Sequence, residues 1–165
     1  MWVMTAAHFV ALFGAAIILI AAAISDAFTY RIPNVLCGLL ILLFPLFIWT
    51  APQTIEWKPT IIIFRLVLGA GLAMFFANLA GAGDIKLLAA AGLWAGPHFI
   101  AVFLVTTALA GGLVALTMMA LTFMRNRSTI AALPMNKVPI PYGIAIAIGG
   151  LTTIYQLTAP LFFAS

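Results

Sequence analysis

An apolar run occupies residues 85–123 and reads IKLLAAAGLWAGPHFIAVFLVTTALAGGLVALTMMALTF, with Lys86 as its one charged side chain. A transmembrane helix needs about 20 apolar residues, so this run is far too long for a single crossing. Gly96-Pro97-His98 stands part-way along it, and a Gly-Pro pair is typical of a turn. We therefore expect two membrane-spanning helices here, joined at that turn.

The composition of the whole chain supports this reading. Of 165 residues, 66% are apolar and only 6% are charged, against about 25% charged residues in soluble domains. Such a chain has too few polar side chains to cover the surface of a soluble globular protein. This excludes a soluble domain, a disordered chain and a nucleic-acid binder. We predict an all-α, polytopic membrane protein with six transmembrane helices, forming one domain over residues 1–165 without a separate soluble part. The other four expected spans are Trp2–Ile24, Val35–Thr50, Thr60–Ala80 and Val138–Phe163.

The basic residues predict the orientation in the membrane. Six crossings place successive loops on alternate sides, and cytoplasmic loops carry an excess of Lys and Arg. Five cations fall on one side and two on the other, so the first side is expected to be cytoplasmic and both termini to face outward. The five are Arg31, Lys86, Arg125, Arg127 and Lys137, and the two are Lys58 and Arg65.

Only three acidic residues are present, and two of them lie at expected membrane boundaries. Glu56 falls in an outer loop, where a solvated charge is ordinary. Asp26 ends the first span and Asp84 follows the third, so two crossings separate them and both face the cytoplasm. Two converging carboxyl groups can activate water as general base and protonate a scissile carbonyl as general acid, without a metal or cofactor.

Simpler readings of the two aspartates remain open. Asp84 precedes an apolar run and could serve only as a helix N-cap. Asp26 could be a boundary charge paired with Arg31. A small transporter or channel that uses both acids as a relay, or a non-catalytic subunit of a secretion machine, would also keep two such residues. The single cysteine, Cys37, excludes an internal disulfide framework and a cysteine-built metal site.

Three blocks carry a family resemblance. Residues 25–34 read SDAFTYRIPN, residues 81–88 read GAGDIKLL, which fits a GxGDxKL pattern, and residues 139–147 read PIPYGIAIA. In order, spacing and length they resemble the type IV prepilin peptidases, which belong to the GxGD aspartic proteases. The resemblance spans nearly the whole chain.

This resemblance implies a specific chemistry. The catalytic aspartates of the family map onto Asp26 and Asp84. The implied substrates are prepilins or pseudopilins with a short basic leader and a hydrophobic N-terminal helix, cleaved at the cytoplasmic face of the bacterial inner membrane. The lipid bilayer is the second partner, and no cofactor, metal or nucleic acid is implied. Longer members also methylate the new N-terminus and carry paired CxxC motifs, so methyl transfer is not expected here. The short length is similar to the peptidases of Flp-type, tight-adherence pilus systems.

The same blocks supply candidate substrate contacts. Prolines free neighbouring carbonyl groups, which an extended peptide could meet, and glycines free to adopt positive φ would let it approach Asp84 closely. Alternatively, the cations only anchor at the interface, and Pro33 and Asn34 only start the second helix. The candidates are Gly81, Gly83, Lys86, Arg31, Pro33, Asn34, Pro141, Tyr142 and Gly143.

Two expectations concern helix packing. Asn78, near the end of the third span, is expected to form an interhelical hydrogen bond. Small residues let helices approach closely in membranes, so the paired glycines are expected at packing points. These are Gly69, Gly71, Gly111, Gly112, Gly149 and Gly150.

Overall fold

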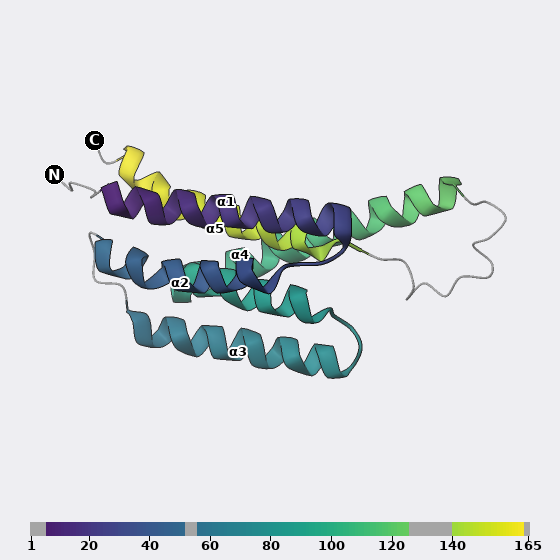
Figure 1. Ribbon diagram of the computed structural model, residues 1–165, viewed down its shortest axis with the longest axis horizontal. Coiled ribbons are helices and arrows are strands. Elements are labelled where there is room, and N and C mark those ends of the chain that lie inside the picture. Colours follow the sequence, from purple (N-terminus) through teal and green to yellow (C-terminus); the bar gives the residue numbers. More distant parts are fainter. Residues whose placement is uncertain (1–5, 52–55, 126–139, 164–165) are drawn as a thin grey trace.

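The computed structural model describes residues 6–51, 56–125 and 140–163. Within these ranges the chain forms helices and no strands, which confirms the all-helical fold class. The helices run roughly along one common axis, with the start of α1 and the end of α5 at the same end of the bundle (Figure 1). They are α1 (Ala6–Thr29), α2 (Asn34–Thr50), α3 (Trp57–Phe76), α4 (Ala82–Arg125) and α5 (Tyr142–Phe163).

Helix α4 is two limbs joined by a sharp reversal. Gly96 has φ 54° and ψ −171°, a conformation that side chains rarely allow. In a straight helix residues 92 and 103 would lie about 16 Å apart along the axis. Instead, a Cβ placed on Gly92 would lie only 3.8 Å from the Phe103 ring. The second limb therefore folds back along the first (Figure 1), and the break expected at Gly96-Pro97 is confirmed.

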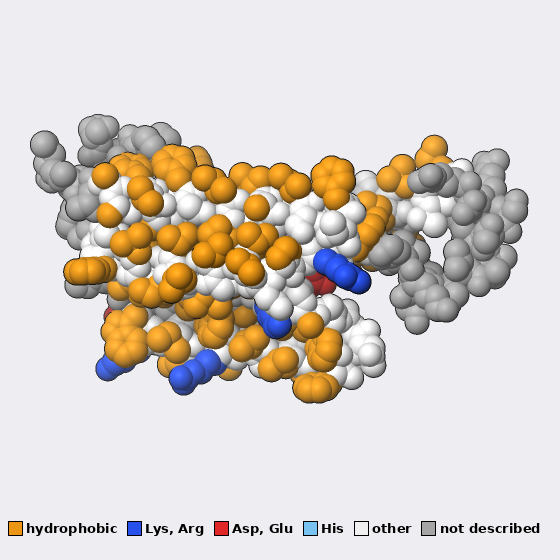
Figure 2. Space-filling model, viewed as in Figure 1, with side chains coloured by type: hydrophobic (Ala, Val, Ile, Leu, Met, Phe, Trp, Pro, Cys, Tyr) orange, Lys and Arg blue, Asp and Glu red, His pale blue; other side chains and the backbone are white. Residues whose placement is uncertain are grey.

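The described helices have the lengths and surfaces of a membrane protein. Four are long and apolar enough to span a bilayer, namely α1, α3, α4 counted as one helix, and α5, while α2 is a shorter apolar helix of 17 residues. Apolar side chains are spread over the whole visible face of the described helices, and few charged side chains interrupt them (Figure 2). Trp49 is 88% exposed and Phe28 is 82% exposed. A surface of this kind suits lipid rather than water.

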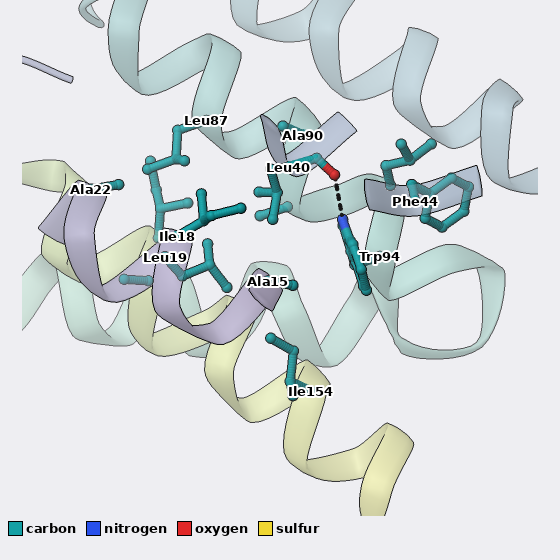
Figure 3. Close-up of a cluster of buried hydrophobic side chains, with 14 of the residues drawn as sticks. Ala15, Ile18, Leu19, Ala22, Leu40, Phe44, Leu87, Ala90, Trp94 and Ile154 are labelled. Carbon is teal, nitrogen blue, oxygen red and sulfur yellow. Dashed lines mark hydrogen bonds between the residues drawn. The ribbon is translucent and has the colours of Figure 1, made fainter. Parts of the chain in front are cut away.

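The core lies between α1, α2, the first limb of α4 and α5 (Figure 3). Within it, Trp94 donates its indole N–H to the Leu40 carbonyl at 3.0 Å. Pro45 of α2 has no N–H, so the carbonyl four residues earlier, that of Ile41, lacks its usual helical donor. Helix α3 packs mainly against α4 and has only Thr60 and Gly71 buried. The core side chains in Figure 3 include Ala15, Ile18, Leu19, Ala22, Leu40, Phe44, Leu87, Ala90, Trp94 and Ile154.

Three helix boundaries differ from those expected. Helix α1 continues to Thr29, so Asp26 lies inside its last turn rather than after it. Helix α3 stops at Phe76 rather than at residue 80, because Asn78 adopts a left-handed conformation with φ 57°. Asn78 is exposed in this turn, so the expectation of an interhelical hydrogen bond was wrong. Helix α5 begins at Tyr142, not at residue 138.

Four of the six glycines expected at helix-packing points are found there, and two are not. A Cβ on Gly71 would meet Ile85. One on Gly149 would lie 3.0 Å from the Phe103 carbonyl oxygen, and one on Gly150 would lie 2.7 Å from Leu19. A Cβ on Gly111 would contact Tyr142 at 3.6 Å, an ordinary packing distance. These four are packing points, whereas Gly69 and Gly112 have nothing within 4 Å and are not.

Candidate active site

A tight turn at the end of α1 fixes the position of Asp26. Tyr30 is left-handed, with φ 52°, and its N–H donates to the Asp26 carbonyl at 2.9 Å. The Ser25 hydroxyl donates to the Arg31 carbonyl at 2.9 Å, which closes the turn. These bonds satisfy backbone groups that a helix end leaves free. The Asp26 side chain is only 4% exposed, so it is directed into the bundle rather than toward solvent.

The buried Asp26 carboxyl group meets the start of α5. The Gly143 N–H donates to Asp26 Oδ2 at 2.6 Å. Gly143 is the second residue of α5, and the first N–H groups of a helix have no partner within the helix. Asp26 thus caps α5 from a different helix. The positive end of the α5 dipole also lies beside this carboxyl.

Asp84 lies in the first turn of α4, which begins at Ala82. It follows the start of the helix, so the reading of Asp84 as an N-cap was wrong. A Cβ on Gly81 would lie 2.8 Å from Asp84 Oδ2, so the carboxyl folds back against the preceding loop. Asp26 lies in the last turn of α1 and Asp84 in the first turn of α4, and these two helix ends lie at the same end of the bundle (Figure 1). The structure thus places the two acids at one end of the bundle, as the order of the helices predicted.

The glycines beside Asp84 leave space rather than supplying unusual backbone angles. Neither Gly81 nor Gly83 has a positive φ, so that expectation was wrong. Gly81 leaves room for the Asp84 carboxyl. A Cβ on Gly83 would lie 3.3 Å from the Cβ of Ile32, a buried residue in the loop after α1. Gly83 thus lets the first two sequence blocks approach each other closely, while Gly81 accommodates a residue of its own block.

A hydrogen bond joins the same two blocks. Lys86 Nζ donates to Asn34 Oδ1 at 3.0 Å. Asn34 is the first residue of α2 and Pro33 precedes it, which confirms that this pair starts the second helix. The bond holds the start of α2 against the start of α4, two residues from Asp84.

Comparison with known protein families shows which family the chain belongs to. A family model described as the type IV leader peptidase family matches residues 13–116, more than half of the chain, including both aspartates. The chain belongs to the type IV leader peptidase family. The peptidase is thus a membrane protease by family and by its apolar helices. No curated protein and no solved structure matches the chain.

The other candidate residues of the peptidase lie around this pair. Arg31 and Pro33 are exposed, and Tyr142 is 40% exposed with its ring near Gly111. Pro141 is fully buried, so its ring is not on the surface for a substrate. Arg127, Lys137 and Pro139 lie outside the described residues. In the described part of the chain, no group of three His, Cys, Asp or Glu side chains is placed to hold a metal ion.

Two contacts of the peptidase site were not predicted from the sequence: the one between Ile32 and Gly83, and the one between Gly143 and Asp26. Ile32 was not singled out, although it fills the space that Gly83 leaves. Its position between Arg31 and Pro33 in a polar turn was the one available signal, because a lone apolar residue there suggests burial. The bond between Gly143 and Asp26 joins residues 117 positions apart, and no local pattern indicates such a pair.

Proposed function

We propose that the chain is an aspartic endopeptidase that removes the basic leader from type IV prepilins or pseudopilins of the Flp type. The observation that carries this proposal is the placement of Asp26 in the last turn of α1 and Asp84 in the first turn of α4, at the same end of the bundle (Figure 1). Family membership supplies the peptidase class. A pair of interacting carboxyls is the simplest proteolytic arrangement that these described residues offer.

The pair accounts for hydrolysis without another group. Two carboxyls that share one site are most stable with one proton between them. The ionised member takes a proton from water as the water oxygen attacks the scissile carbonyl carbon, and the protonated member donates to the carbonyl oxygen. The tetrahedral intermediate then collapses, the C–N bond breaks, and the leaving amine takes up a proton. The products are the leader carboxylate and the mature N-terminus.

The proposed topology has six crossings, with α2 and both limbs of α4 each spanning the membrane. The cation distribution then places both aspartates at the cytoplasmic face. The first limb of α4, residues 82–95, is about 21 Å long at 1.5 Å per residue, against a hydrocarbon core of about 30 Å. Asp84 therefore lies below the membrane surface or in a thinned bilayer. A prepilin whose apolar helix lies in the same bilayer would carry its scissile bond to this depth.

Replacement of each aspartate tests the proposal. Asp26→Asn and Asp84→Asn keep the side-chain size and remove the acid–base function. We expect each to lower leader cleavage of a co-expressed Flp-type prepilin by at least about 100-fold, with normal enzyme levels in the membrane. Glu56→Gln, which changes the exposed third acid, is the matched control and should cleave normally.

The outcomes separate the competing functions. Processing that survives in either aspartate variant would refute the protease assignment. Abolished cleavage with intact protein would leave the non-catalytic subunit without support. If the protein were instead a transporter that uses the same acids, the Asp26→Asn and Asp84→Asn variants would lose ion flux. The wild-type protein would then leave a co-expressed prepilin uncleaved.

A further inference from the structure

The N-terminus of α5 makes a contact that the two-aspartate proposal does not use. Gly143 is buried, and its N–H donates to Asp26 Oδ2 at 2.6 Å. A hydrogen bond between a backbone N–H and an ionised carboxylate is shorter and stronger than one between neutral groups. Because the donor belongs to a helix backbone, it has one fixed direction. The contact therefore restricts how the Asp26 carboxyl can rotate.

Gly143 also has no room for a side chain. A Cβ there would lie 2.8 Å from the Asp26 Cβ, 2.9 Å from Oδ2 and 3.1 Å from Cγ. Separations below 3.0 Å require something to move, and the Asp26 Cβ is fixed to the α1 backbone. Farther along the same interface, Gly150 packs directly on Leu19. Helix α5 can therefore relieve such a clash only by displacing Asp26 or by separating from α1.

We propose that Gly143 is a positioning residue for leader cleavage, whose backbone N–H and missing side chain fix the Asp26 carboxyl at the end of the bundle that carries Asp84. It acts through Asp26 and not through the substrate, because it is buried under that carboxyl. This replaces the expectation that Gly143 contacts substrate. Gly143 lies beyond residues 13–116, the part of the chain that the family comparison matches. The inference rests on the proposed function, since it assigns a role in the same reaction.

The first test separates positioning from substrate binding by kinetics. Gly143→Ala should lower kcat for prepilin cleavage by about 100-fold, the scale expected for a displacement near 1 Å at a reacting group, while KM changes less than twofold. Gly112→Ala is the matched control, since a Cβ there meets nothing within 4 Å and cleavage should be unchanged. A raised KM with normal kcat would show that Gly143 contacts substrate, and unchanged kinetics would show no role. Either result overturns the proposal.

The second test does not depend on activity. In a Cys37→Ser background, Asp26→Cys with Gly143→Cys brings two Cβ atoms to 2.8 Å, so a shift of about 1 Å between α1 and α5 gives the separation of about 3.8 Å that a disulfide needs. Oxidation should cross-link this pair rapidly, whereas Asp26→Cys with Ile148→Cys, an exposed residue later in α5, should not cross-link. Failure of the first pair to cross-link, in protein that is inserted in the membrane at normal levels, would overturn the contact. Processing that survives in Asp26→Asn while the cross-link forms would instead refute the proposed function alone.

Discussion

Lys86 at the start of α4 donates a hydrogen bond to Asn34 at the start of α2, with 3.0 Å between Nζ and Oδ1. Both side chains are exposed, so the bond contributes little to global stability. Its position matters more, because it crosses between the block that follows Asp26 and the block that contains Asp84. Beside it, Ile32 packs against Gly83. The two contacts hold the two loops together.

We predict that Asn34 and Lys86 act as one unit in catalysis. Asn34→Ala and Lys86→Met should each lower kcat/KM for leader cleavage by about fivefold, the scale of a hydrogen bond worth about 1 kcal/mol. The double variant should lose no more than either single one, because the interaction can be removed only once. Steady-state kcat/KM values for cleavage of purified prepilin by the wild type, the two single variants and the double variant complete this double-mutant cycle. Lys58→Met, on the opposite end of the bundle, is the control, and fully additive losses would contradict the coupling.

We predict opposite effects of alanine at two helical glycines. Gly149→Ala should lower the free energy of unfolding by about 1–3 kcal/mol, because the added methyl would meet the Phe103 carbonyl and the Thr107 hydroxyl. Gly69→Ala meets nothing within 4 Å and should raise it by about 0.5–1 kcal/mol through reduced backbone entropy. Denaturation of the purified protein in detergent measures both. Equal effects at the two positions would show that α4 and α5 do not pack at Gly149.

We predict that the Trp94 indole N–H stabilises the core. Trp94→Phe leaves the buried Leu40 carbonyl without this donor and should cost about 1–3 kcal/mol in the free energy of unfolding. Trp49→Phe, at a position 88% exposed, should change it by less than about 0.5 kcal/mol. Thermal unfolding in one detergent compares the two. A similar shift for both would mean that lipid or detergent contact, and not this bond, determines the effect.

We predict that the turn at Gly96 faces the same side of the membrane as Glu56. In a Cys37→Ser background, Glu56→Cys and His98→Cys should react with an impermeant maleimide added outside the cell, since both positions are exposed. Arg31→Cys and Ala82→Cys, also exposed, should react only after the cytoplasmic face is opened. A His98→Cys variant that is protected from the outside would rule out two crossings by α4.

Much of the fold could be predicted because a few local features control it. The apolar content predicted the helical membrane protein, and the Gly96-Pro97 pair predicted the reversal in α4. Helix ends were less accurate. The left-handed residues Tyr30 and Asn78 determine where α1 and α3 stop, and neither is the glycine that usually indicates such a turn.

The candidate site, like the fold, could be predicted from the sequence only in part. Asp26 and Asp84 could be paired from sequence, because each crossing reverses the chain and parity alone decides which loops share a side. The roles of the surrounding residues could not. Gly81 and Gly83 were expected to supply positive φ angles and instead leave space, and Gly143 was expected to contact substrate but bonds Asp26.

The sequence by itself determined that this chain is a helical membrane protein, because whether a segment is long and apolar enough to suit a bilayer depends only on composition and on the order of the residues. The tertiary structure alone decided which groups touch the residues of the candidate site. Gly143 reaches Asp26 across 117 positions, and Lys86 reaches Asn34 across 52. Such partners depend on how far each helix is rotated and shifted against its neighbours. Side-chain packing between distant segments fixes these quantities, and no local pattern in the sequence contains them.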